Sequence, residues 1–174
     1  MDMSKDTIAV SATVNASVDT VFAVLADPTT HEAIDGTGWV RQPLDGKPLA
    51  GVGQVFRMAM YHSNHGGKDY EVANRVEVFD PPRAIAWQPG QGPDDSLEFG
   101  GWFWRYDLAP VGEDRTDVTL TYDWSAVPQE TREHIPFPPF EPSHLDNSLK
   151  HLATLAEADQ RARFADPARP RYGP

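Results

Sequence analysis

Two segments that alternate between apolar and polar residues constrain this chain more than any other feature. Residues 102–108 place Trp, Trp, Tyr and Leu at every second position, and residues 118–124 alternate in the same way. A tight turn at residues 112–114 would set Trp104 opposite Tyr122 and leave one face of the pair apolar. The two segments therefore predict an antiparallel hairpin with one buried face.

The opposite face of this hairpin is polar. It carries Arg105 and Asp107 on the first strand and Asp123 on the second. We expect Arg105 to form a weak surface ion pair with the diagonal Asp123. Gly100 and Gly101, just before the first strand, would permit a bend there.

The same alternation recurs along the chain and predicts more strands. They are expected at residues 7–14, 39–42, 52–62, 70–79, 84–88, 102–108 and 117–124. Short clusters of Pro, Gly, Asn and Asp separate most of them, and connections of this kind join antiparallel neighbours. Helical spacing appears instead at residues 18–27, after an N-cap at Ser17, and at residues 29–34 and 143–164.

The long helix and the sheet need each other. A single amphipathic helix cannot bury its apolar stripe alone, and neither can a curved sheet with one apolar face. We therefore predict an α+β, helix-grip fold, in which a curved antiparallel β-sheet wraps around the long C-terminal α-helix in the order β-α-α-β₆-α.

A second predicted hairpin, with its turn near His65, has polar residues on its apolar face. Pairing Phe56 with Asn74 also turns Gln54 and His62 inward. A buried polar group without a partner costs about 1–3 kcal/mol, so something must hydrogen-bond these side chains. Neighbouring protein groups, buried water or a ligand would all serve.

Length and composition set the broad class. The chain has 174 residues, of which 40% are hydrophobic, and contains no cysteine. We expect one domain over residues 1–164 and a disordered, Pro-rich tail over residues 165–174. The N-terminus lacks the pattern of a secretory signal, and no apolar run is long enough to span a membrane. A cytoplasmic location is the default expectation.

The charge limits the partners. A formal net charge of −11 argues against nucleic acid and against insertion into an anionic membrane, because both would repel the protein. A small hydrophobic molecule is easier to reconcile with this charge. The sequence leaves a homodimer open.

The chain resembles the START-like (SRPBCC) superfamily, in its polyketide cyclase/dehydrase and lipid-transport branch. Residues 10–34, 76–90 and 143–157 carry the resemblance, which extends over residues 7–157. It implies an apolar cavity between the curved sheet and the C-terminal helix. Because members of the superfamily range from cyclases to carriers and co-chaperone domains, the resemblance implies a container and no particular reaction.

Aromatic and Met side chains on the inner face are the candidate cavity wall. We predict these ligand-binding residues: Phe56, Met58, Met60, Asn74, Trp87, Trp102, Trp104, Trp124, Phe137, Phe140, Leu149 and Leu152. Phe137 and Phe140 belong to the Pro-rich connection at residues 126–142, which has the length of a lid. They would either plug the cavity mouth or attach this connection to the start of the long helix.

A catalytic role would need an acid or base on the inner face. His62 qualifies by strand phase and His134 by its loop position, while Tyr106 and Tyr122 could donate to a carbonyl oxygen. His62 and His65, with Asp69 nearby, straddle a turn and imply no third metal ligand. We therefore expect no metal site and no cofactor.

The sequence leaves three functions open. The first is the binding of a small hydrophobic, ring-containing ligand beneath the C-terminal helix. The second is a polyketide cyclase/dehydrase-type reaction on such a ligand. The third is a ligand-free, co-chaperone-like interaction module, which would need a filled core and an exposed apolar patch.

Overall fold

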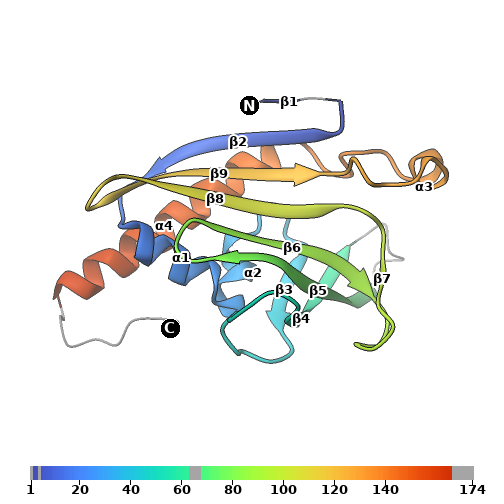
Figure 1. Ribbon diagram of the computed structural model, residues 1–174, viewed down its shortest axis with the longest axis horizontal. Coiled ribbons are helices and arrows are strands. Elements are labelled where there is room, and N and C mark those ends of the chain that lie inside the picture. Colours follow the sequence, from blue (N-terminus) through green and yellow to red (C-terminus); the bar gives the residue numbers. More distant parts are fainter. Residues whose placement is uncertain (1, 4, 63–67, 166–174) are drawn as a thin grey trace.

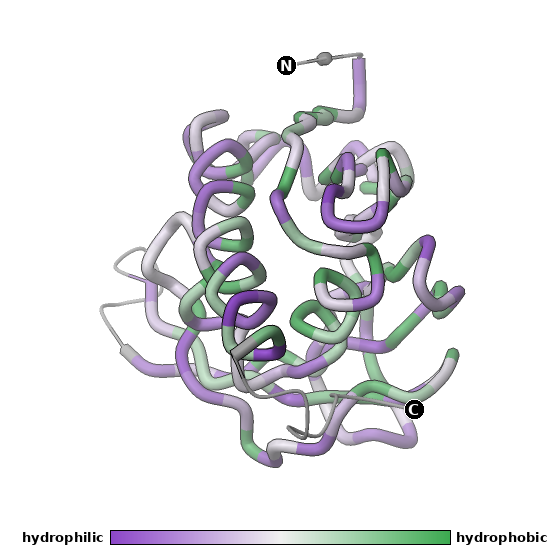
Figure 2. The backbone as a smooth tube through the Cα atoms, turned by 90° about the vertical axis from the view of Figure 1, so that its left-hand side faces the viewer, coloured by the Kyte–Doolittle hydropathy of each residue, from purple (hydrophilic) through white to green (hydrophobic). Residues whose placement is uncertain are grey.

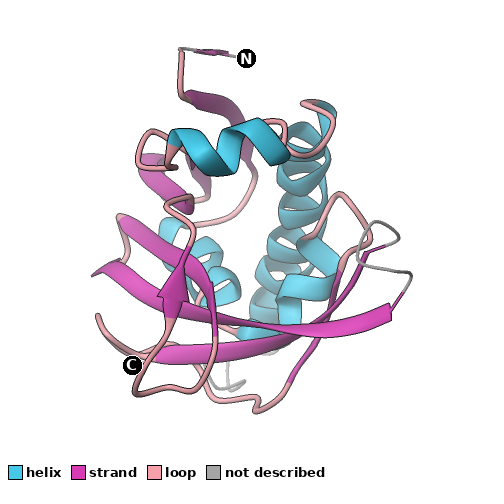
Figure 3. Ribbon diagram, turned by 90° about the vertical axis from the view of Figure 1, so that its right-hand side faces the viewer, coloured by secondary structure: helices cyan, strands magenta, loops and turns pink. Residues whose placement is uncertain are grey.

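The alternating segments form one antiparallel sheet that curves around the helices (Figures 1 and 3). The computed structural model describes residues 2–3, 5–62 and 68–165. The strands are β1 (Asp2–Met3), β2 (Thr7–Val14), β3 (Val40–Pro43), β4 (Val55–His62), β5 (Lys68–Asp80), β6 (Ala84–Gln91), β7 (Glu98–Phe99), β8 (Phe103–Gly112) and β9 (Arg115–Asp123). The helices are α1 (Val18–Leu25), α2 (His31–Ile34), α3 (Gln129–His134) and α4 (Ser143–Ala165), and a 3₁₀ turn, η1 (Pro28–Thr30), precedes α2.

The strand order places an early strand of the chain beside the last one. Along the sheet it is β1-β2-β9-β8-β6-β5-β4-β3, with β7 paired to the end of β6. The N-terminal strand β2 therefore lies beside β9, the strand that leads into α3 and α4. This arrangement confirms the predicted α+β helix-grip fold, with a curved sheet around the C-terminal helix.

Both predicted hairpin registers are confirmed. Trp104 lies opposite Tyr122 in the β8–β9 pair, and Phe56 lies opposite Asn74 in the β4–β5 pair. Trp102 lies just outside the ladder, since β8 begins at Phe103. The inner faces of both hairpins thus point toward the helices, as the alternation requires.

The ion pair predicted on the outer face is wrong. Arg105 pairs with Asp107, two residues along the same strand, at 3.0 Å between Nε and Oδ2. The Asp123 carboxylate instead accepts hydrogen bonds from the backbone N–H and hydroxyl of Ser125, where the chain leaves β9. The Asp123 carboxylate is therefore engaged in the turn that follows β9. Asp107, which lies on the same face of β8 as Arg105, is close enough to pair with the Arg105 guanidinium.

Helix α4 covers part of the concave face of the sheet. Leu145, Leu149, Leu152 and Ala156 are fully buried along one side of it. Figure 2 shows the hydrophobic residues of this helix on its inner side and hydrophilic ones outside. Among the described residues, no helix combines the length and the apolar character needed to cross a membrane. The predicted tail over residues 165–174 lies outside the described residues, apart from Ala165 at the end of α4.

Three elements were not expected. The strands β1 and β7 have only two residues each, too few for alternation to reveal. The third is α3, which lies inside the predicted Pro-rich connection and has no buried residue. Arg132 attaches α3 to the sheet by donating to the carbonyls of Val127 and Trp124 and pairing with Asp6 at 2.8 Å.

A close backbone approach joins the start of α4 to the loop after α2. A Cβ atom on Gly36 would lie 2.5 Å from the carbonyl oxygen of His144 and 2.9 Å from the Cβ of Asn147. Neither contact involves the end of a flexible side chain. The position therefore requires glycine for lack of space.

We expect Gly36→Ala to displace the first turn of α4 and lower the free energy of unfolding by about 1–3 kcal/mol. Urea denaturation measures this change. Gly51→Ala is the matched control, because a Cβ there meets no atom within 4 Å. Equal stability of the two variants would contradict the close approach.

His31 is a buried titratable group between the helices and the sheet. Its Nε2 lies 2.8 Å from the carbonyl oxygen of Leu25, and its ring stacks on Trp87 at 5.0 Å between centroids. Burial lowers the pKa of His31, although the Leu25 carbonyl and Asp27 oppose the shift. The folded protein therefore holds this imidazole neutral where the unfolded chain would take up a proton.

The free energy of unfolding should fall as the pH drops below about 6.5, the ordinary histidine pKa, by up to about 1.4 kcal/mol per pH unit. His31→Gln keeps a donor for the Leu25 carbonyl and should flatten this dependence. His134→Gln, at an exposed position of α3, is the control. Denaturation curves at pH 7.5 and 5.5 test this, and an unchanged slope in His31→Gln would contradict it.

Candidate functional site

A cavity of about 850 Å³ lies between the concave face of the sheet, α2, the start of α4 and residues 134–140. Its wall contains four of the five tryptophans: Trp39, Trp87, Trp102 and Trp104. The volume falls in the range of small-molecule sites, about 300–1,000 Å³. The helices therefore do not fill the concave face completely.

The aromatic rings of the wall support one another. Trp104 stacks on Phe140 at 5.5 Å between centroids and contacts Tyr122 at 4.5 Å. Trp39 packs edge-on against His62 at 3.9 Å. Mutual ring contacts hold these side chains in place on the cavity wall.

Phe137 and Phe140 lie where the Pro-rich connection borders the cavity. Both line the cavity, and Phe137 contacts Trp102 across the connection at 5.8 Å between centroids. Phe140 also packs against His144 in the first turn of α4, at 4.8 Å. The connection thus borders one side of the cavity, and the Phe140 side chain attaches it to the start of α4.

The structure brings most of the predicted site residues together. Those that line the cavity are Met58, Met60, His62, Asn74, Trp87, Trp102, Trp104, Tyr106, Tyr122, Phe137 and Phe140. His134, the second histidine considered for catalysis, also lies on the lining. Their roles toward a ligand remain predictions.

Four of the predicted ligand-binding residues are not among those that line the cavity. Phe56 lies behind the rings of His31 and Trp87, each 5.6 Å away between centroids. Leu149 and Leu152 come after the first turns of α4, beyond the part that borders the cavity, and Trp124 follows the end of β9. All four are buried in the hydrophobic core: Phe56, Trp124, Leu149 and Leu152.

A carboxylate marks one end of the cavity. The side chain of Asp35 is 5% exposed and follows α2. Its oxygens accept hydrogen bonds from the backbone N–H groups of Thr37, Trp39 and Val40 and from the Thr37 hydroxyl, at 2.9–3.2 Å. Its own loop therefore supplies donors to the buried carboxylate, and no Lys or Arg side chain among the described residues pairs with it.

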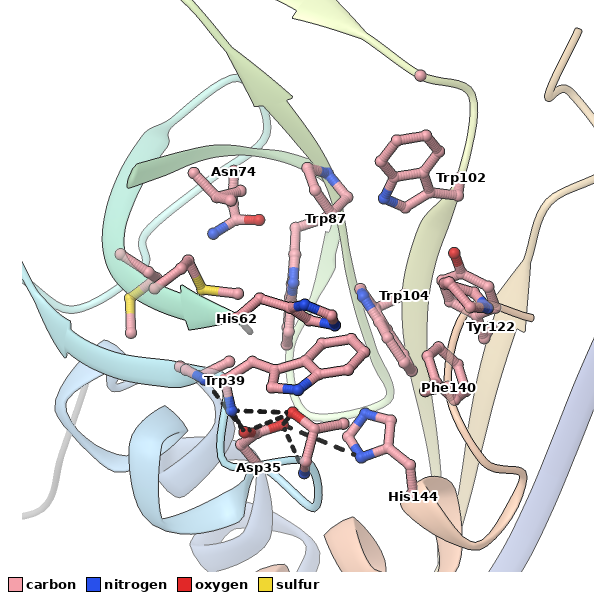
Figure 4. A pocket seen from close by; sticks show the side chains of 18 of the residues that line it. Asp35, Trp39, His62, Asn74, Trp87, Trp102, Trp104, Tyr122, Phe140 and His144 are labelled. Carbon is pink, nitrogen blue, oxygen red and sulfur yellow. Dashed lines mark hydrogen bonds and ion pairs between the residues drawn. The ribbon is translucent and has the colours of Figure 1, made fainter. Parts of the chain in front are cut away.

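His144 adjoins this carboxylate. Its Nδ1 lies 3.9 Å from Oδ1 of Asp35 and 3.5 Å from the Ser148 hydroxyl, and Figure 4 shows its ring between Asp35 and Phe140. Burial lowers the pKa of His144, Asp35 opposes this shift, and His151 adds to it. The imidazole is thus a neutral group beside a buried carboxylate.

The two candidate tyrosines are buried phenols. Burial raises the pKa of Tyr106, with a further contribution from the charge of Asp35, and burial alone raises that of Tyr122. Both hydroxyls therefore stay protonated at neutral pH and keep a proton to donate. The charge of Asp35 also raises the pKa of Tyr70, after burial, so its field reaches several parts of the wall.

The polar side chains on the apolar face of the second hairpin differ in their hydrogen bonds. Gln54 exchanges hydrogen bonds with the loop before β4, through the N–H of Ala50 and the carbonyl of Pro48. Asn74 is buried on the cavity lining, and no hydrogen bond joins its amide to another described residue. Figure 4 places Asn74 on the far side of the aromatic rings from Asp35.

Sequence reasoning missed Asp35, His144 and His31 as lining residues. Asp35 precedes a Gly-containing turn, which is typical of an Asp that hydrogen-bonds its own backbone. For His144, the sequence pattern indicated only the start of a helix. Neither signal says that the two residues meet, since their contact depends on the packing of α4 against the loop at Gly36.

The described part of the chain contains no group of three or more His, Asp or Glu side chains placed to hold a metal ion. His65, which the sequence placed near His62 and Asp69, lies outside the described residues.

Solved structures share the fold. Protein NE0264 from Nitrosomonas europaea is similar with a TM-score of 0.66 at 13% identity, over 92% of this chain and 99% of that one. Protein CV1439 from Chromobacterium violaceum gives 0.60 at 22% identity, over 88% and 99%. A START superfamily protein from Mycobacterium smegmatis gives 0.57 at 17% identity, over 90% and 98%.

Sequence comparison supports the same grouping. Uncharacterized protein Rv0088 from Mycobacterium tuberculosis is 26% identical over 129 residues, which are 73% of this chain and 51% of that protein. The chain thus spans about half the length of the curated relatives it matches. The family model for polyketide cyclase/dehydrase and lipid transport matches residues 5–157. With a START-like fold around an aromatic cavity, the chain belongs to the polyketide cyclase/dehydrase and lipid transport family.

Proposed function

We propose that this protein binds a small, mostly apolar, ring-containing molecule in the cavity between the sheet and α4. The observation that carries the proposal is the cavity itself, about 850 Å³ in volume and walled by four tryptophans. Such a volume suits one ligand of drug size, and flat aromatic walls favour flat, ring-containing guests. The amide of Asn74, which is buried on the lining and makes no hydrogen bond to another described residue, is available to a polar group on that ligand.

The residues around the cavity also suit apolar ligands of different shape. Met58 and Met60 lie on the cavity lining, and Met side chains adapt to apolar groups of different shape. The ligand-free interaction module is less favoured, because it requires a filled core. The large hydrophobic side chains exposed in the described residues are dispersed along the chain: Leu44, Val52, Val111, Ile135 and Phe164.

Binding of N-phenyl-1-naphthylamine, an uncharged probe that fluoresces in apolar surroundings, tests the proposal. Val72→Trp should weaken binding at least about tenfold, because the half-buried Val72 lines the cavity and the larger ring would occupy ligand volume. Fluorescence titration measures the dissociation constant of each variant.

Glu71→Trp is the matched control, since Glu71 is the preceding residue of β5, exposed on the outer face. It should bind the probe like the wild type, and thermal unfolding should show both variants folded. A wild-type dissociation constant in Val72→Trp would contradict binding in this cavity.

A second candidate function is proton-transfer catalysis on the bound molecule. The position of His144 supports it, because a neutral imidazole beside a carboxylate can act as a general base on a carbon next to a carbonyl group. Protonated Tyr106 or Tyr122 could then donate to the enolate oxygen. This arrangement assigns the base to His144 in place of His62, the histidine that the strand phase indicated.

Exchange of the methyl protons of 2-acetylnaphthalene with D₂O, followed by NMR, tests this second function. His144→Gln should lose the protein-dependent exchange while binding changes by less than about threefold, and His62→Gln should retain the exchange. Exchange no faster than in buffer would exclude catalysis on this substrate. Loss in His62→Gln alone would return the role of base to His62.

A further inference from the structure

We infer that the cavity selects its ligand by charge: it accepts an uncharged or cationic aromatic molecule and rejects an anionic one, with Asp35 as the determinant. The inference rests on the proposed binding function and specifies the chemical class of the ligand. It separates this cavity from a carrier of fatty acids or other carboxylates, which are anions at neutral pH.

The first observation concerns which charged side chains line the cavity. Asp35 and Glu98 are acidic, and no Lys or Arg lies among the described residues that line the cavity. A carboxylate taken from water into an apolar site needs a cationic partner or several hydrogen-bond donors to offset its lost hydration. The described part of the wall offers no permanent cation for that purpose.

The second observation is that the charge of Asp35 is not neutralised by a cation. Its hydrogen-bond partners are three backbone N–H groups and one hydroxyl, which stabilise a carboxylate without cancelling its charge. His144, 3.9 Å away, could become cationic, but its burial disfavours the protonated form. An anionic ligand would therefore be buried close to an uncompensated negative charge.

The third observation is the reach of that charge. After burial, the charge of Asp35 also raises the pKa of Tyr70 on β5 and of Tyr106 on β8, so it acts on lining residues of two strands. Glu98 is exposed at the rim, where solvent screens it, and contributes less. The aromatic faces of the tryptophans add to the preference, because they attract cations.

Three probes with one ring system test the inference at pH 7.5 by isothermal titration calorimetry: 2-naphthol, 2-naphthylmethylamine and 2-naphthoate. For the wild type we expect the dissociation constant of 2-naphthoate to exceed that of 2-naphthol at least about tenfold, with the amine binding no more weakly than the naphthol. Equal affinity for naphthoate and naphthol would overturn the inference and leave the binding function intact. Failure of all three probes to bind would overturn the binding function as well.

The determinant is tested by Asp35→Asn, which should reduce the ratio of the naphthoate and naphthol dissociation constants to within about threefold. Asp107→Asn removes the same charge on the outer face of the sheet and should keep the wild-type ratio. An unchanged ratio in a folded Asp35→Asn protein would exclude Asp35 as the determinant.

A second variant serves if the loop at Asp35 does not tolerate the amide. Met60→Lys adds a cation to the lining and leaves Asp35 in place, so it should raise the affinity for 2-naphthoate relative to 2-naphthol. Ala59→Lys, the preceding residue on the opposite face of β4, is its control and should keep the wild-type ratio. No gain in Met60→Lys over Ala59→Lys would overturn the electrostatic account.

Discussion

The contact between the loop at residues 35–38 and the first turn of α4 determines the shape of the whole interior. Gly36 has no side chain, so the backbone of His144 can approach it closely and α4 can begin there. From that point the helix buries its leucines against β2, β9 and α1, which completes the core. The helix does not cover the rest of the concave face, which borders the cavity.

This geometry explains why a polar pair lies in an otherwise aromatic cavity. Asp35 terminates α2 and directs its carboxylate into its own loop, where backbone N–H groups satisfy it. The helix start then places His144 against the same carboxylate. Burying these two groups costs free energy that a purely apolar wall would not require, and the proposed selection of a ligand by Asp35 gives this cost a functional reason.

Much of the fold follows from the sequence, because alternation and helical spacing are local patterns. The pairings of Trp104 with Tyr122 and of Phe56 with Asn74 could be derived from turn position and strand phase alone. The site is less accessible to such reasoning. Strand phase says which side chains point inward, but not how far α4 extends across them, so it could not separate Met58 on the cavity wall from Phe56 in the core. Asp35 and His144 are more than one hundred residues apart, and no local pattern connects them.

Native mass spectrometry of the purified protein tests most directly whether the cavity binds one small aromatic molecule. After incubation with an excess of 2-naphthol, the account predicts a complex with one ligand per chain in the wild type and its loss in Val72→Trp, while Glu71→Trp retains it. A spectrum that shows only the unliganded mass for the wild type, or equal complex formation in Val72→Trp and Glu71→Trp, would contradict it.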